Sequence, residues 1–229
     1  MRPGVTAVSD TLTRSVEDYL KAIYRLSGDI RPASTSEIAQ HLALAPASVS
    51  GMINRLSEQG LLEHERYRGV QLTPEGRRVA LRMLRRHRLI ESYLVAHLGY
   101  SWDTVHDEAE RLEHAVSDDL VERMADALGN PRVDPHGDPI PSPDGSMLET
   151  VEVALTDMEP GHSARIHRVR TREPEFLRHL AELGLIPGAH VTLRDRRPFL
   201  GPITVETDAA THVVGHELAA ALLCAEEES

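Results

Sequence analysis

Apolar residues recur with helical spacing in the first part of the chain. In SVEDYLKAIYRL (15–26) they occupy positions 16, 19, 20, 23, 24 and 26, which predicts an amphipathic helix. STSEIAQHLAL (34–44) begins with Ser34 and has a Glu three residues later, the pattern of a capping box. APASVSGMINRLSEQG (45–60) has Pro46 near its first turn and ends at Gly60. We therefore expect three successive helices, the last two joined by a short turn.

The pattern then changes from helix to hairpin and back. LLEHERYRGVQLTPEG (61–76) predicts two short strands around YRG, and Pro74 opens a long, Arg-rich helix over 74–98. A second helix is expected over 106–120. The segment 129–145 contains five Pro and three Gly, which excludes a continuous helix or strand.

The last segment has a different pattern. ARIHRV, HVTLRD and PITVET read as short strands, FLRHLAELG reads as a helix that ends at Gly184, and several short strands in about 70 residues favour a small barrel. We place Cys224 in an apolar C-terminal helix. The expected fold class is mainly α with small β elements, in three domains over residues 1–73, 74–145 and 146–229.

Composition and charge restrict the class of protein. No apolar run approaches the roughly 18 residues of a membrane span, the N-terminus lacks a signal-peptide shape, and there is a single Cys, so we expect a cytoplasmic protein. The net charge of −11 hides a division. Residues 1–98 contain 14 basic and 10 acidic residues, while the remainder contains 11 and 26. The first half could face a polyanion and the second could hold cations.

Two helices over 36–43 and 46–58 with a hairpin after them have the spacing of a winged helix-turn-helix. Small and polar side chains early in the second helix would let it enter the major groove, and arginines of the hairpin would reach phosphates. A helical hairpin with no role in DNA binding is the alternative. The expected DNA contacts are Thr35, Ser36, Ala47, Ser48, Ser50, Gly51, Asn54, Arg55, Arg66 and Arg68.

Histidines and carboxylates concentrate in HDEAERLEHAVSDDL (106–120). On a helix, His106, Glu110, Glu113 and His114 fall within an arc of about 100°, beside an apolar stripe that includes Leu120. His87 and Glu91 form a second pair at i, i+4 on the preceding helix, and the loop GYSW (99–102) would bring the two pairs together. A solvated helix face is the alternative. Ligands of this kind without Cys suit Mn²⁺, Fe²⁺, Co²⁺ or Zn²⁺, and the many oxygen donors favour Mn²⁺.

These segments together resemble the diphtheria-toxin-repressor family of metal-dependent regulators. The resemblance rests on VEDYLKAIYRL, the winged helix, RHRLIESYL, VHDEAERLEH and PHGDPIP, and it extends over nearly the whole chain. It implies a DNA-binding domain, a helical domain for metal binding and dimerisation, and a C-terminal SH3-like barrel like that of ferrous-transport accessory proteins.

The resemblance also implies metal ligands. One site would use Asp18, Glu110, Glu113 and His114, and the other would use His87, Glu91 and His106 with help from the C-terminal domain. There Glu175 aligns best, Glu173 is an alternative, and Arg172 stands where iron regulators have a Glu. Iron-responsive members have Met at the position of Asp18 and Cys or Met at that of Glu110, so this chain has the pattern of the manganese-responsive branch. Lys21 departs from that pattern, since short manganese regulators carry a Glu there.

The function implied is a Mn²⁺-dependent repressor of metal-uptake genes that binds a palindromic DNA operator as a homodimer, with no membrane partner and no enzymatic activity. Co²⁺, Zn²⁺ and Cd²⁺ are further metals that such ligands can bind in vitro. An Fe²⁺-dependent repressor of iron-acquisition genes is the first alternative. A metalloenzyme or a metal-transport accessory protein is a remote one, because no substrate loop is apparent and a chaperone has no need of a winged helix.

Overall fold

The computed structural model describes residues 12–27, 31–65, 68–147 and 150–225. The chain forms two compact units, one of residues 1–85 with 143–145 and the other of residues 86–142 with 146–229. We describe each unit by itself. The boundary between them falls inside a long helix, and the division into three domains stays a prediction.

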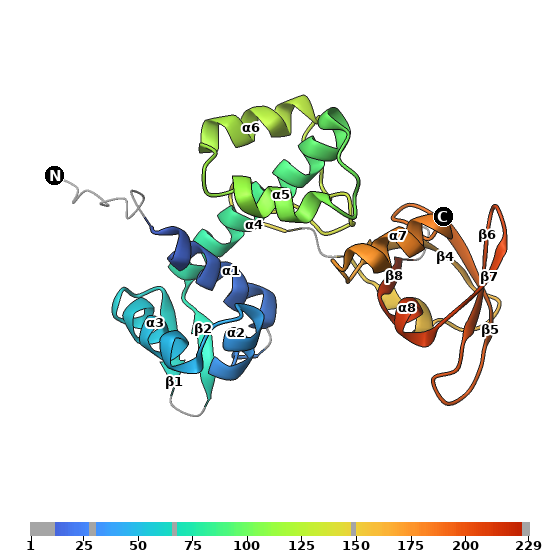
Figure 1. Ribbon diagram of the computed structural model, residues 1–229, viewed down its shortest axis with the longest axis horizontal. Coiled ribbons are helices and arrows are strands. Elements are labelled where there is room, and N and C mark those ends of the chain that lie inside the picture. Colours follow the sequence, from blue (N-terminus) through green and yellow to red (C-terminus); the bar gives the residue numbers. More distant parts are fainter. Residues whose placement is uncertain (1–11, 28–30, 66–67, 148–149, 226–229) are drawn as a thin grey trace. The chain divides into compact units, whose positions relative to one another are not determined.

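The first unit is a helical domain with a two-stranded hairpin (Figure 1). Its elements are α1 (Arg14–Ser27), α2 (Thr35–His41), α3 (Pro46–Glu58), β1 (Leu62–Glu65), β2 (Gly69–Leu72) and the first half of α4 (Pro74–Leu98). The predicted order of elements is confirmed. The capping box is also present, because Glu37 N–H donates to Ser34 Oγ at 3.2 Å and Ser34 N–H donates to Glu37 Oε2 at 2.8 Å.

One apolar core holds this unit together. Val49, Ile53 and Leu56 of α3 are buried in it with the apolar stripe of α1. The hairpin strands are antiparallel, with Leu62 opposite Leu72, and an isolated bridge from Ala33 to Val70 joins the hairpin to the loop before α2. The opposite face of α3 is therefore left exposed beside a fixed hairpin.

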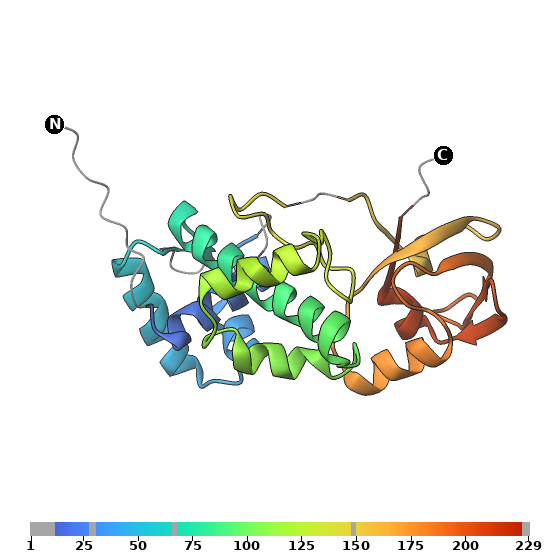
Figure 2. The same cartoon turned by 90° about the horizontal axis from the view of Figure 1, so that it is seen from above.

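In the second unit, α5 (Val105–Leu112) and α6 (Asp118–Ala127) pack against the second half of α4 (Figure 1, and from above in Figure 2). The prediction of one helix over 106–120 is wrong. Glu113 is the C-cap of α5, and Ser117 caps α6 by accepting a hydrogen bond from Leu120 N–H at 3.2 Å. Since the chain turns between the helices, Leu120 leaves the buried stripe and is 42% exposed.

The C-terminal part of this unit is built on an antiparallel sheet. Its elements are β3 (Val153–Ala154), the 3₁₀ turn η1 (Leu155–Asp157), β4 (Ser163–Val169), α7 (Pro174–Glu182), β5 (His190–Arg196), β6 (Ile203–Thr207), β7 (Thr211–Val214), α8 (His216–Ala220) and β8 (Leu222–Ala225). The strand order is β3-β8-β4-β5-β6-β7, and its apolar side chains form one core with Leu177 and Leu180 of α7.

Two expectations for this part need correction. The sheet is open within the described residues, because β3 has two residues and β7 has four, and neither pairs with the other to close a barrel. Cys224 lies in strand β8 and not in a helix, although it is fully buried as a packed residue should be. No described helix is long and apolar enough to cross a membrane.

The Pro-rich segment packs against β4 of the same unit. Val169 N–H donates to the His136 carbonyl at 2.9 Å, and a Cβ on Gly137 would lie 2.0 Å from the His167 carbonyl oxygen. Gly137 has φ +89°, so only glycine fits here without strain. The segment over 134–138 is therefore a packed part of this unit.

Glycine at the start of α4 makes an equally close approach in the first unit. A Cβ on Gly76 would lie 2.0 Å from the Leu61 carbonyl oxygen, whereas one on Gly51 of α3 would meet nothing within 4 Å. We predict that Gly76→Ala destabilises the first unit by about 1–3 kcal/mol. Gly51→Ala should stabilise it by up to about 1 kcal/mol. Urea unfolding followed by circular dichroism measures both, and equal stability of the two variants would contradict the packing described.

Candidate metal centre

Helix α4 presents two buried polar side chains on one face. His87 and Glu91 are each 1% exposed, and His87 Nε2 lies 3.1 Å from Glu91 Oε1. A spacing of four residues places them one above the other along the helix. Burial of a carboxylate and an imidazole costs free energy unless each has partners, so this pair indicates a site.

Helix α5 adds His106 and Glu110 to this pair. His106 Nδ1 lies 2.9 Å from Glu91 Oε1 and 3.0 Å from His87 Nε2. Glu110 Oε1 lies 3.8 Å from a nitrogen of each histidine. We call His87, Glu91, His106 and Glu110 the histidine cluster.

The histidine cluster has the donor spacing of a metal site. Bonds of about 2.1 Å at right angles would place neighbouring donors about 3.0 Å apart. His87 Nε2, His106 Nδ1 and Glu91 Oε1 are separated by 2.9 to 3.1 Å. Because the three donors are imidazole nitrogens and a carboxylate oxygen, they fit a divalent ion of the first transition row.

The second nitrogen of His87 is also occupied. His87 Nδ1 lies 2.6 Å from Glu113 Oε2, a fully buried carboxylate. Burial alone would lower the pKa of His87, but Glu91 and Glu113 outweigh it and hold that pKa above its ordinary value. A metal at Nε2 would therefore have to displace a proton, while Glu113 keeps the ring oriented.

The turn after α5 fixes Glu113 in this position. Arg86 Nη1 donates to the Glu113 carbonyl at 2.9 Å, and Arg86 Nη2 lies 2.5 Å from Asp118 Oδ1. Glu113 Oε1 also lies 3.3 Å from His114 Nε2. Arg86 thus ties the end of α5 and the start of α6 to α4.

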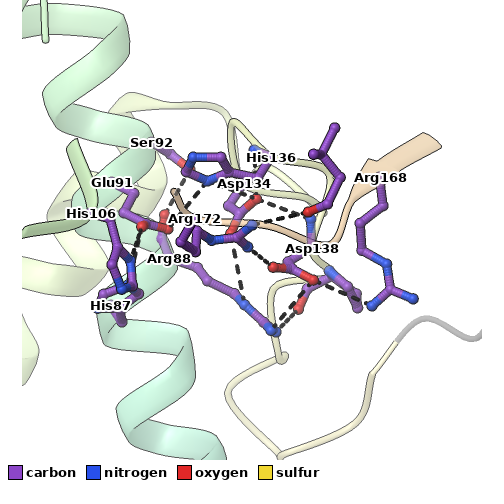
Figure 3. A network of polar contacts seen from close by, with 12 residues as sticks. His87, Arg88, Glu91, Ser92, His106, Asp134, His136, Asp138, Arg168 and Arg172 are labelled. Atoms are coloured by element: carbon purple, nitrogen blue, oxygen red, sulfur yellow. Dashed lines mark hydrogen bonds and ion pairs between the residues drawn. The ribbon is translucent and has the colours of Figure 1, made fainter. Parts of the chain in front are cut away.

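A second group of donors lies on the other side of Glu91 (Figure 3). It consists of Glu91, Asp134 and His136, which are 1%, 4% and 0% exposed, and we call it the linker cluster. His136 Nδ1 lies 4.0 Å from both Glu91 Oε2 and Asp134 Oδ1. Sequence reasoning missed Asp134 and His136, because they lie in a Pro-rich segment without periodicity.

Each residue of the linker cluster has one buried side-chain atom without a hydrogen bond. Among the described residues, Glu91 Oε2, Asp134 Oδ2 and His136 Nδ1 are buried atoms with no hydrogen-bond partner. His136 Nε2 lies 2.7 Å from the Trp102 carbonyl, which only accepts, so Nε2 carries the proton and Nδ1 presents a lone pair. Glu91 Oε2 and Asp134 Oδ1 each lie 4.0 Å from Nδ1, so the cluster fits a cation.

The electrostatics of the linker cluster reflect this crowding. Burial, with Asp138 and Glu91 nearby, raises the pKa of Asp134 to about 7. Burial and the charge of Arg172 lower the pKa of His136 to about 4. The cluster therefore favours a neutral imidazole, the form that binds metal.

The remaining predicted ligands belong to other elements of the chain. Asp18 is half-buried on α1 of the first unit, where its Oδ2 lies 3.9 Å from Arg14 Nε. Glu173 and Glu175 are exposed at the start of α7, and neither belongs to a donor group found among the described residues. The assignment of Asp18 and Glu175 as ligands stays a prediction.

The expected DNA contacts lie mostly on exposed positions of the first unit. Arg66 lies outside the described residues, and Thr35 is half-buried. The exposed positions are Ser36, Ala47, Ser48, Ser50, Gly51, Asn54, Arg55 and Arg68.

Comparisons with known proteins agree over most of the chain. The N-terminal DNA-binding domain of iron-dependent repressors matches residues 11–70, their metal-binding and dimerisation domain matches residues 73–142, and the FeoA domain matches residues 153–226. The iron-dependent repressor IdeR of Mycobacterium leprae is 32% identical over 222 residues, which cover 90% of this chain and 91% of that protein. The chain belongs to the diphtheria-toxin-repressor family.

The similar proteins include manganese regulators as well as iron-dependent repressors. The transcriptional regulator MntR of Lysinibacillus sphaericus is 36% identical over 116 residues, which cover 51% of this chain and 83% of that protein. A manganese-dependent transcriptional repressor in complex with manganese is 40% identical with a TM-score of 0.85, over 93% of this chain and 100% of that chain. The protein is a metal-dependent transcriptional repressor and not an enzyme, and it carries the dimerisation domain of this family.

In the absence of metal, repulsion between the carboxylates of the linker cluster should lower the thermal stability of the protein. We predict that Asp134→Asn raises the melting temperature of the protein in EDTA by several degrees, because it removes one buried negative charge. The same change should reduce the rise in melting temperature that Mn²⁺ produces.

The exposed Asp126 of α6 provides a matched control, and Asp126→Asn should change neither value. Thermal unfolding by circular dichroism, with and without metal, makes the comparison. An Asp134→Asn variant that melts below the wild type in EDTA would contradict this account of the linker cluster.

Proposed function

We propose that the protein represses metal-uptake genes when Mn²⁺ binds its buried donor clusters. The observation that carries this proposal is the spacing near 3.0 Å of His87 Nε2, His106 Nδ1 and Glu91 Oε1. The donors of both clusters are nitrogen and oxygen only, with no sulfur among them. The lack of sulfur donors weakens the preference for softer ions, and the carboxylate donors suit Mn²⁺.

The resemblance to the manganese-responsive branch supports the same metal. Glu110 stands where iron-responsive members have Cys or Met, and Asp18 stands where they have Met. We infer that Asp18, Glu110, Glu113 and His114 form a further site in the metal-bound protein. Fe²⁺ is the alternative metal, since iron-dependent repressors are relatives over most of the chain.

Metal would act on DNA binding through charge. In the absence of metal the clustered carboxylates repel one another, and a cation neutralises them. We infer that this fixes the two recognition helices of a homodimer about 34 Å apart, which matches successive major grooves of a palindromic operator. Metal and DNA must then strengthen each other's binding reciprocally. A regulator that works on the chromosome is expected in the cytoplasm.

The ligand role of Glu110 can be tested directly. We predict that Glu110→Ala leaves a folded dimer but abolishes Mn²⁺-dependent binding to the operator. Glu108 lies on the same helix and pairs with Arg111 at 3.0 Å, so Glu108→Ala is the matched control and should bind like the wild type.

The measurement is fluorescence anisotropy on a labelled promoter of a manganese-transport gene, in EDTA, in Mn²⁺ and in anaerobic Fe²⁺. Binding at lower Mn²⁺ than Fe²⁺ is the expected result. Equal or better binding with Fe²⁺ would overturn the choice of metal, and unchanged Mn²⁺-dependent binding by Glu110→Ala would overturn the ligand assignment.

The exposed face of α3 gives a separate prediction for DNA. Asn54 is exposed while its neighbour Ile53 is fully buried, so its amide can reach a base edge. We expect Asn54→Ala to weaken specific binding about tenfold, which corresponds to about 1.4 kcal/mol, without changing Mn²⁺ affinity in the absence of DNA. Glu58→Ala, on the last residue of the same helix, should not weaken it. Operator and non-specific DNA are compared at one salt concentration.

A further inference from the structure

Arg172 is a fixed cation beside the linker cluster (Figure 3). It lies in the C-terminal part of the second unit, between β4 and α7. Its Nη1 donates to the Val169 carbonyl at 3.0 Å and to the Thr171 carbonyl at 2.8 Å, and its Nη2 pairs with Asp138. Two carbonyls and a carboxylate thus hold the guanidinium in place.

The charge of Arg172 acts on the ligands of the linker cluster. Its partner Asp138 is held against the cluster, because Asp138 N–H donates to Asp134 Oδ1 at 3.0 Å, and the positive charge therefore lies close to Asp134. The charged groups around the cluster are Glu91, Asp134 and Asp138 on the acidic side, and Arg88, Arg168 and Arg172 on the basic side. Without metal, arginines compensate part of the negative charge.

This compensation works against a metal ion. A divalent cation near Asp134 and His136 would be repelled by a guanidinium that cannot lose its proton. The histidine cluster differs in this respect, because the side chains that contact His87 and His106 there are carboxylates and imidazoles.

We propose that Arg172 sets the metal affinity of the linker cluster. Its tethered positive charge keeps this affinity below that of the histidine cluster. The inference rests on the proposed function. The same guanidinium pairs with Asp138 of the Pro-rich segment, so the contact that packs this segment against the C-terminal domain also opposes the metal. The two clusters should therefore fill at different metal concentrations.

A charge series at position 172 tests the proposal in the full-length protein. Arg172→Lys keeps the positive charge, Arg172→Gln removes it and Arg172→Glu reverses it. Mn²⁺ affinity of the weaker class of sites should rise along this series, on the order of tenfold at each step after Arg172→Lys. Free Mn²⁺ is measured by electron paramagnetic resonance during titration, and circular dichroism verifies that each variant is folded.

Arg178 provides the matched control. It also belongs to the C-terminal part, and it pairs with Asp103 at 3.1 Å rather than with the linker cluster. Arg178→Gln should leave both classes of sites unchanged. If it raises affinity as Arg172→Gln does, loosening of the C-terminal part explains the effect and the proposal is wrong.

A double-mutant cycle locates the effect. The gain from Arg172→Gln should disappear in an Asp134→Asn background, because the two residues act on the same ion. A gain that persists there, or equal affinities along the charge series, would overturn the proposal. If the wild type binds no Mn²⁺ at any site, the proposed function fails first, and the two failures are thus distinguishable.

Discussion

The carboxylate of Glu91 is the contact on which the metal centre depends. One oxygen lies near His87 and His106, and the other faces His136 at 4.0 Å. A single 1% exposed side chain therefore belongs to both clusters. Because a carboxylate has two oxygens with lone pairs on each, it can bridge two cations without moving. Occupation of one cluster then changes the charge that the other experiences.

Buried carboxylates require positive charge close by, and this fold supplies it in two ways. On the side of α5, the imidazole of His87 lies between Glu91 and Glu113. On the side of the Pro-rich segment, Arg88 contacts Asp134 at 3.8 Å and the Pro139 carbonyl. The first kind of charge can leave as a proton, whereas the second is permanent. In the metal-free protein, positive charge therefore stabilises the carboxylates of both clusters, but only the charge at the histidine cluster can leave when a metal binds.

Local signals predicted most helices and four of the six residues of the two clusters. The capping box at Ser34, Pro46 at the start of α3 and the i, i+4 pair of His87 and Glu91 are contained in short stretches. The break after Leu112 was missed because Glu113 keeps helical backbone angles, so the periodicity runs past the end of α5. The sequence does not predict His136 as a donor for a different reason. Its ring is positioned by Trp102 and its backbone by Val169, contacts between segments far apart in the sequence.

The contact of Gly137 with strand β4 implies that the C-terminal domain cannot be removed without disturbing the linker cluster. Shorter members of the family match only about half of this chain, as the Lysinibacillus regulator does. In this protein, however, His136 is fully buried, and its carbonyl accepts a hydrogen bond from Val169. Cutting the chain after residue 145 would remove Val169 and strand β4, and with them the N–H group that bonds the His136 carbonyl. The C-terminal domain therefore supports the linker cluster, and a chain without it would need another contact to hold His136 in place.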